Sequence, residues 1–256
     1  MRFHRQPDDI LKELGIYSPD DIDLDLVAWS LGAEVKRLSL SDCEGNIIGT
    51  DKKAIITINN DSPLPRQRFS LGHELGHWIN DRGKNLTYRC NSVDMKQRDV
   101  KKHDFKQSKE VRANQFSAQL IMPEFMCEQH LSGTDITLEL AIFIANEFRV
   151  SLTSALIRLV DLSKLPCMLI CWDDNGTRQW FVRNEIIPER IWPHKTLSNP
   201  KTALTDSTQL EVDADKWINN CDSENYTVEE NVYSNGYNVF SLLFWKDETQ
   251  LMQFDD

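Results

Sequence analysis

The sequence lacks any apolar run approaching about 18 residues, so it predicts no helix that spans a membrane. Its N-terminal segment, "MRFHRQPDDILKELG", turns acidic at once and has no apolar centre of the kind found in signal peptides. Both absences lead us to expect a cytoplasmic protein. Hydrophobic residues still make up 40% of the chain, which is enough to build a core.

The chain also lacks paired cysteines and an excess of basic residues. Its 6 cysteines include no C-x-x-C pair, and their spacing is not that of a disulfide scaffold. We therefore expect the cysteines to be free thiols in the cytosol. The net charge of −11 argues against a protein that coats nucleic acid, because neutralising phosphates requires clustered Lys and Arg. A single local basic groove remains compatible with this charge.

Patterning over residues 1–163 predicts an α+β domain. "PDDIDLDLVAWSLGAEV" is typical of a helix that ends at Gly32. The runs "AEVKRLSL", "IIGT" and "AIITIN" predict a small antiparallel sheet. A helix is expected over 63–80, a polar surface loop over 81–106, and a further helix at "SKEVRANQFSAQLIM". The first helix has an apolar stripe made of Ile22, Leu26, Trp29 and Leu31.

Two helices are expected within 136–162, separated by "RVS". Such a pair can be a DNA-binding helix-turn-helix or a packed helical hairpin. We favour the hairpin, because the second helix carries one basic residue, Arg158.

The composition changes after Pro166, and 164–256 predicts a separate small α+β domain. Two apolar runs around Asn175-Gly176 indicate a β-hairpin, and "YNVFSLLFWKDETQLMQF" a second one. Cys167 and Cys171 lie four apart on a predicted strand, so they share a face, and we interpret them as core residues.

One short segment indicates a metal site. His73-Glu74-Leu75-Gly76-His77 is an H-E-x-x-H motif, in which a helix brings both imidazoles to one face. Gly72 and Gly76 lie together on a flank of this helix, where they would let another element approach closely. The alternative, two surface His on an amphipathic helix, leaves the Glu and the Gly pair unexplained. Residues on the opposite side would anchor the helix in the core: Leu71, Leu75 and Trp78.

A catalytic zinc site needs a third protein ligand and an open position. The best candidate is Glu110, at the start of the helical run "EVRANQFSAQLIMP", 33 residues after His77. His103 and Asp104 are rivals, but they fall in the predicted loop, which holds a ligand less rigidly.

"RQRFSLGHELGHWIND" followed by "EVRANQFSAQLIMP" resembles the ImmA/IrrE family of bacterial and phage zinc metallopeptidases. The upstream segments "IDLDLVAWSLGAEV", "EGN" and "AIITIN" also fall where that family has counterparts, so the resemblance covers roughly residues 20 to 160. It implies a zincin-like core with a helix-turn-helix-like helical extension at 134–163. It also implies Zn²⁺ bound by His73, His77 and Glu110, with Glu74 as the catalytic acid/base.

In such a site zinc lowers the pKa of a bound water to about 7, and a carboxylate accepts its proton. Glu74 would have that role and would not bind metal. His103 and Tyr88 are candidates for stabilising the transition state.

The resemblance also suggests a substrate. Members commonly cleave a partner helix-turn-helix repressor, often after DNA damage, which derepresses a mobile-element, defence or stress operon. Two other hypotheses remain open at this point. One is a non-proteolytic regulator that binds the repressor through the protease fold, although all four motif positions are intact. The other is a DNA-binding factor that uses residues 136–162.

The segment Tyr88-Arg89-Cys90 adds a further resemblance, to the CapP-type proteases of anti-phage (CBASS-associated) operons. They carry a Tyr-x-Cys cysteine switch and a C-terminal GAF-like sensor domain. Cys90 would then be an inhibitory fourth zinc ligand, and 164–256 a GAF-like sensor. An ordinary loop thiol is the alternative for Cys90. Single-stranded DNA is the activator that this resemblance implies. Several aromatic side chains of 164–256 could stack on its bases: Trp172, Trp180, Phe181, Trp192 and Trp217. Most of them are more simply interpreted as core residues of a small domain.

Overall fold

The computed structural model describes residues 5–81, 86–90, 105–131, 136–219, 226–234, 236–246, 249 and 251, with the backbone alone at 86 and 105–108. The chain forms two compact units. One comprises residues 1–132 and 139–155, and the other residues 133–138 and 156–256. The division falls within a helix, and the domain boundary expected after residue 163 stays a prediction. His103, Asp104 and Cys221 lie outside the described residues.

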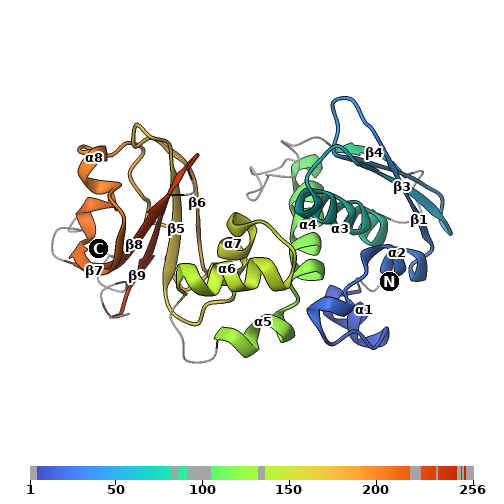
Figure 1. Ribbon diagram of the computed structural model, residues 1–256, viewed down its shortest axis with the longest axis horizontal. Coiled ribbons are helices and arrows are strands. Elements are labelled where there is room, and N and C mark those ends of the chain that lie inside the picture. Colours follow the sequence, from blue (N-terminus) through green and yellow to red (C-terminus); the bar gives the residue numbers. More distant parts are fainter. Residues whose placement is uncertain are drawn as a thin grey trace. The chain divides into compact units, whose positions relative to one another are not determined.

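The first unit alternates short helices and strands before two long helices (Figure 1). In chain order its elements are α1 (Pro7–Glu13), η1 (Pro19–Asp21), α2 (Leu24–Ser30), β1 (Ala33–Leu38), β2 (Gly45–Gly49), β3 (Ala54–Asn59), α3 (Leu64–Asp81), β4 (Leu86–Cys90), α4 (Phe105–Ile121), α5 (Glu124–Leu131) and α6 (Leu138–Glu147). α7 (Leu152–Leu162) runs across the division between the units.

The sheet of this unit has the order β1-β3-β2-β4. β2 pairs antiparallel with both neighbours, but β1 and β3 run parallel. The prediction of an antiparallel sheet was therefore wrong for one of its three pairs. The chain passes from β1 to β2 and back to β3, so that β3 separates the first two strands and runs in the direction of β1.

The segment predicted as a polar loop contains a strand, β4, at one end of the sheet. Thr87 and Arg89 are exposed, whereas Tyr88 is half-buried and Cys90 is buried. An edge strand with one solvent-facing side has polar residues at alternate positions, so its composition resembles that of a loop. Only the pairing with β2 identifies it as a strand.

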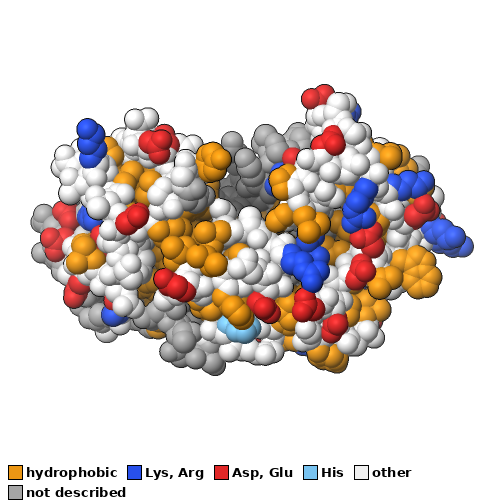
Figure 2. Space-filling view, viewed as in Figure 1, with side chains coloured by type: hydrophobic (Ala, Val, Ile, Leu, Met, Phe, Trp, Pro, Cys, Tyr) orange, Lys and Arg blue, Asp and Glu red, His pale blue; other side chains and the backbone are white. Residues whose placement is uncertain are grey.

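Of the four residues in the predicted apolar stripe, Ile22 and Leu31 are buried as expected, but the prediction was wrong for Leu26 and Trp29. Leu26 is 64% exposed and Trp29 is 78% exposed, whereas Leu24, Val27 and Ala28 are buried. The helix begins later than expected, because the Asp23 side chain accepts hydrogen bonds from the first turn and caps it there. Figure 2 shows hydrophobic side chains gathered on the surface over α1 and α2.

α3 is the central layer of the first unit, with the sheet on one side and α4 along another (Figure 1). Leu71, Leu75 and Trp78 are buried, as the sequence predicts, and the indole nitrogen of Trp78 donates to the carbonyl of Leu31 over 2.9 Å. This anchoring fixes the rotation of α3. The opposite face, which carries the two motif imidazoles, is therefore held against α4.

The second unit contains a five-stranded antiparallel sheet with the order β6-β5-β9-β8-β7. Its elements are β5 (Cys167–Trp172), β6 (Arg178–Arg183), α8 (Pro200–Ala203), β7 (Ser207–Asp213), η3 (Ala214–Lys216), β8 (Thr227–Ser234) and β9 (Val239–Phe244). The likeness of this unit to a GAF domain stays a prediction.

The first predicted hairpin of this unit is confirmed: β5 pairs with β6, and Gly176 has a φ of +74° in the turn. The second was wrong, because β9 pairs with β8, which precedes it, and with β5. Cys167 and Cys171 are buried as expected, and burial raises the pKa of their thiols to about 12 and about 11, respectively.

Other features bear on the alternative functions. Arg158, the single basic residue of α7, is 7% exposed, which favours a packed helix over one that reads DNA. Trp172 and Trp217 are fully buried, whereas Trp192 is 49% exposed. No single helix among the described residues is long and apolar enough to cross a membrane. Taken together, α6 and α7 have the length and composition of a membrane span, but a sharp bend separates the two helices.

Candidate metal centre

The close approach of α3 and α4 depends on two glycines. A Cβ at Gly76 would lie 2.8 Å from the Cα of Ala113, and a Cβ at Gly72 would lie 2.6 Å from Oγ of Ser117. Real side chains do not come that near to a backbone carbon, so the Gly pair lets α4 lie directly on α3. The expectation that these glycines admit another element is confirmed. Glu110, one turn before Ala113 on α4, is thereby brought to the motif face.

Four candidate donor atoms converge between α3, α4 and β4. One atom from each of His73, His77, Cys90 and Glu110 lies within 4.8 Å of all the others, and all four residues are buried. Nε2 of His77 is 3.1 Å from Nε2 of His73, and Oε2 of Glu110 is 3.2 Å and 3.4 Å from the same two nitrogens. Sγ of Cys90 is 3.6 Å from Nε2 of His77.

These spacings fit a tetrahedral metal ion. Zinc bonds of about 2.1 Å to nitrogen and oxygen and about 2.3 Å to sulfur require donors to be spaced at roughly 3.4–3.6 Å, the edges of the tetrahedron. The imidazole, carboxylate and thiol donors are also those that zinc prefers. The residues present therefore fit Zn²⁺, and Sγ of Cys90 lies near enough to be considered as a fourth donor.

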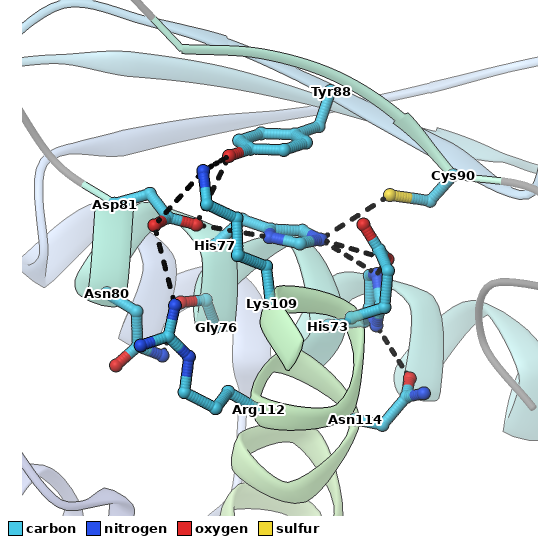
Figure 3. A network of polar contacts seen from close by, with 11 residues as sticks. His73, Gly76, His77, Asn80, Asp81, Tyr88, Cys90, Lys109, Arg112 and Asn114 are labelled. Carbon is cyan, nitrogen blue, oxygen red and sulfur yellow. Dashed lines mark hydrogen bonds and ion pairs between the residues drawn. The ribbon is translucent and has the colours of Figure 1, made fainter. Parts of the chain in front are cut away.

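Contacts behind the imidazoles orient them toward the shared centre. Nδ1 of His73 lies 2.8 Å from the side-chain oxygen of Asn114, a contact that places the proton on Nδ1 and leaves Nε2 free to bind metal (Figure 3). Nδ1 of His77 faces Oδ2 of Asp81 at 3.6 Å. Sequence reasoning missed both residues; Asn114 and Asp81 lie one turn beyond a ligand, at i+4, which is the signal that could have found them.

The ionisation of His73 and Glu110 suits metal binding, whereas that of His77 does not: burial acts to lower its pKa, but contacts with Asp81 and Glu110 outweigh burial and raise the pKa to about 9, so a metal would have to displace a proton there. Burial lowers the pKa of His73, which leaves a neutral imidazole at pH 7. Burial acts to raise the pKa of Glu110, but contacts with both imidazoles outweigh it and bring this pKa to about 2. Glu110 is therefore a carboxylate at neutral pH, as a ligand must be.

Glu74 lies beside the cluster but outside it. Its side chain is fully buried, and neither carboxylate oxygen has a hydrogen-bond partner among the described residues. Burial raises its pKa to about 7, although the charge of His77 and the nearby thiol of Cys90 oppose that rise. A carboxylate with a pKa near 7 and free lone pairs has the properties of a general base at neutral pH.

Tyr88 and Cys90 bring β4 onto His77. The Tyr88 ring stacks on the His77 imidazole, with centroids 4.3 Å apart and planes at 8° (Figure 3). The Tyr88 hydroxyl contacts Oδ2 of Asp81 at 3.4 Å and accepts a hydrogen bond from Lys109 over 2.6 Å. The structure thus places Tyr88 against the face of the His77 imidazole, while Cys90 approaches the donor cluster.

The structure therefore places six of the predicted site residues in one buried cluster and its immediate surroundings: His73, Glu74, His77, Tyr88, Cys90 and Glu110. The seventh, His103, lies outside the described residues. The roles of these residues as ligands, base and inhibitor stay predictions.

Comparison with known proteins extends these observations. Residues 23–160, more than half of the chain, match the model of the peptidase family M78, described as the IrrE N-terminal-like domain. No curated protein matches the sequence. Among solved structures, a Mycobacterium tuberculosis transcriptional regulator is similar, with a TM-score of 0.53 and 11% identity over 93% of this chain and 73% of that one. At this identity the likeness concerns the fold alone.

Proposed function

The chain belongs to the IrrE N-terminal-like family of metallopeptidases, and from this premise we propose that it is a regulated zinc-dependent endopeptidase. The observation that carries the proposal is the donor cluster of His73, His77 and Glu110, with the buried carboxylate of Glu74 beside it. A structural role alone would not require a buried, unpartnered carboxylate next to a metal site.

The residues divide the chemistry between them. Zinc, when bound, supplies a Lewis acid that polarises the scissile carbonyl and acidifies water. His73, His77 and Glu110 hold the ion, and Asn114 keeps His73 in the ligating tautomer. Glu74 takes a proton from the attacking water and passes it to the leaving amine, a transfer that its raised pKa favours.

In this proposal Cys90 keeps the enzyme inactive. A catalytic site needs one position open to water, and a thiolate at the fourth corner would close it. The 3.6 Å separation between Sγ of Cys90 and Nε2 of His77 supports this arrangement. Activation then requires Cys90 to leave the site, as in the CapP-type proteases that the Tyr-x-Cys segment resembles.

The proposed substrate is a partner helix-turn-helix repressor, whose cleavage after DNA damage would derepress a defence, mobile-element or stress operon. Family membership supports this substrate, and the fold shared with a transcriptional regulator is consistent with it. The second unit is proposed to be a GAF-like sensor.

One cluster in the second unit supports single-stranded DNA as the activator. The rings of Phe181 and Trp192 meet edge to face at 5.3 Å, and the guanidinium of Arg183 lies 5.4 Å from the Trp192 ring centre. Trp192 is half exposed. A ring of this kind beside a cation suits base stacking together with phosphate attraction.

The second candidate is a regulator that binds the repressor without cutting it. The donor set with Cys90 at its fourth corner favours this candidate, because a closed zinc site can be purely structural. One experiment separates the two. Purified protein is assayed for zinc and for cleavage of the repressor encoded beside it, with and without single-stranded DNA.

The Glu74→Gln variant sharpens this assay, with the exposed Glu34→Gln as its matched control. The enzyme proposal expects Glu74→Gln to keep zinc and lose cleavage, while Glu34→Gln retains both. Cleavage at the wild-type rate by Glu74→Gln contradicts the assigned base. Repressor binding with no cleavage under any condition favours the non-proteolytic regulator.

A further inference from the structure

α2 carries two large apolar side chains that do not enter the core. Trp29 is 78% exposed and Leu26 is 64% exposed, although the other side of the same helix is buried. These two residues are three positions apart, so their side chains are neighbours on the outer face of α2. Two further exposed residues, Leu14 and Tyr17, precede them in the chain. Exposed apolar groups of this size mark interaction surfaces, and Trp and Tyr are among the residue types that most often anchor them.

α2 is fixed to the motif helix but lies away from the metal centre. The indole nitrogen of Trp78 donates to the carbonyl of Leu31, the residue that ends α2, over 2.9 Å. Trp78 lies on the core side of α3, opposite the face that carries the motif imidazoles. The outer face of α2 is therefore held rigidly in the first unit, where it cannot touch the reacting groups.

The surface around Leu26 and Trp29 is acidic. Residues 7–30 contain seven carboxylates and a single cation, Lys12. Three of the carboxylates are paired with arginines of neighbouring segments: Glu13 with Arg5, Asp20 with Arg149 and Asp25 with Arg37. Among the described residues, no cation lies within ion-pair distance of Asp9, Asp21 or Asp23, and all three are exposed. The surface therefore keeps a net negative charge.

This charge selects among the possible occupants. A second copy seated on the same surface would bring like charges together, in a chain whose net charge is already −11. Nucleic acid would be repelled for the same reason. The surface suits a protein that presents apolar side chains among Lys and Arg. A helix-turn-helix repressor has such cations, because it must neutralise DNA phosphates.

We propose that the outer face of α2, with Leu26 and Trp29 at its centre and carboxylates around it, is a docking surface for the repressor. This inference rests on the proposed function, from which it takes the repressor as substrate. It adds a second point of attachment, at which a basic surface of the repressor binds α2 while another segment of the repressor reaches the metal centre. A protein that lacks such a basic surface is cleaved independently of α2.

A contact away from the reacting groups has a distinct kinetic signature. It is made equally in the ground state and in the transition state, so it lowers KM and leaves kcat unchanged. Changes on α2 should therefore alter the affinity for the repressor and spare the chemical step.

Leu26→Ala combined with Trp29→Ala removes the centre of the docking surface. Because both side chains are exposed, the free energy of unfolding should stay nearly constant, which urea unfolding checks. Binding of fluorescein-labelled repressor is measured by fluorescence anisotropy in proteins that also carry Glu74→Gln, so that no hydrolysis intervenes. We expect the dissociation constant to rise by at least about tenfold, the scale of losing an aromatic anchor. Leu38→Ala with Ile55→Ala, two exposed apolar residues of the sheet, is the matched control and should bind as the parent does.

Asp9→Asn combined with Asp21→Asn tests the role of charge. The dissociation constant of the parent should rise as sodium chloride is added, since salt screens exposed charges. The dependence should be shallower in the Asn variant, whereas Glu34→Gln with Asp51→Asn, two exposed carboxylates outside the surface, should keep the parent's dependence. An Asn variant with the salt dependence of the parent would contradict a basic partner.

Cleavage separates this inference from the peptidase proposal. In the Cys90→Ser background, Leu26→Ala with Trp29→Ala should raise KM for the repressor about as much as the dissociation constant and preserve kcat. Cleavage of reduced, alkylated casein, an unfolded acidic chain, should not change.

The inference is overturned if the parent does not bind the repressor, if the α2 variant binds it as tightly as the parent, or if the sheet control loses as much affinity. It is also overturned if casein cleavage falls together with repressor cleavage. If α2 controls repressor binding but the Cys90→Ser protein cleaves neither substrate, the peptidase proposal fails and the docking surface stands.

Discussion

Nδ1 of His73 and the side-chain oxygen of Asn114 lie 2.8 Å apart in the buried interface of α3 and α4. This contact joins the two helices that carry the donor cluster. It also decides which nitrogen of His73 is left for a metal, since the ring can donate from one nitrogen and accept at the other.

Replacing Asn114 with Ala should weaken zinc binding by about 10–100-fold, the usual cost of losing a contact behind a ligating imidazole. Competition with a chromogenic chelator measures the affinity. Gln115→Ala, at the exposed neighbouring position of α4, is the control and should bind zinc as the wild type does. Equal affinities for the two variants would show that the Asn114 contact does not organise the site.

The sequence anticipates the parts of the site that local spacing encodes. Two His at i and i+4 on a helix share a face wherever that helix lies, so the spacing alone pairs His73 with His77. The glycines on the same helix likewise indicate a close neighbour. Glu110 was the best candidate for the third ligand because it opens a predicted helix, and the family resemblance supported it, but nothing in its own spacing links it to a helix 33 residues away.

The parts that the sequence misses depend on tertiary contacts. Asn114 and Asp81 acquire a role only when α4 meets α3. β4 is too short and too polar to be distinguished from a loop until β2 supplies a partner. On α2, Leu26 and Trp29 are exposed, and their large apolar side chains misdirected the prediction of the buried stripe.

Gly76→Ala should destabilise the first unit by about 1–3 kcal/mol, the usual cost of forcing extra atoms into a packed core. The added Cβ would meet the backbone of Ala113 at 2.8 Å, which only a shift of α4 can relieve. That shift would also move Glu110 and lower zinc affinity. Urea unfolding and the chelator assay measure the two effects.

A matched comparison for this variant exists one turn earlier. At Gly72 the nearest atom is Oγ of Ser117, at 2.6 Å, which Ser117→Ala removes. Gly72→Ala combined with Ser117→Ala should therefore be milder than Gly76→Ala. Ser117→Ala alone is measured as well, because it loses the hydrogen bond that the Ser117 hydroxyl donates to the carbonyl of Phe69. If Gly72→Ala costs as much as Gly76→Ala after that loss is subtracted, the backbone approach at Gly76 is not what limits the helix packing.

Removing zinc should loosen the first unit and leave the second unchanged. A ligand that binds only the folded state adds about 4 kcal/mol of stability at a concentration 1,000 times its dissociation constant. All four candidate ligands belong to the first unit. Hydrogen–deuterium exchange after chelation should therefore speed up in α3 and α4 and stay constant in β5 and β9. Equal changes in both units would place the stabilising ion elsewhere.

Cys90→Ser should raise basal cleavage of the repressor in the absence of an inducing signal. A serine hydroxyl is a much poorer zinc ligand than a thiolate, so the fourth position becomes open to water. We expect a gain of at least about tenfold, because each 1.4 kcal/mol or so of lost ligand binding shifts the closed-to-open equilibrium by that factor. Cys43→Ser, which also replaces a buried thiol of this unit but lies outside the donor cluster, is the control and should leave the basal rate unchanged. Zinc content is measured alongside, since a variant that lost its ion would be inactive for another reason. A zinc-loaded Cys90→Ser protein with the basal rate of Cys43→Ser would show that the thiol does not inhibit the enzyme.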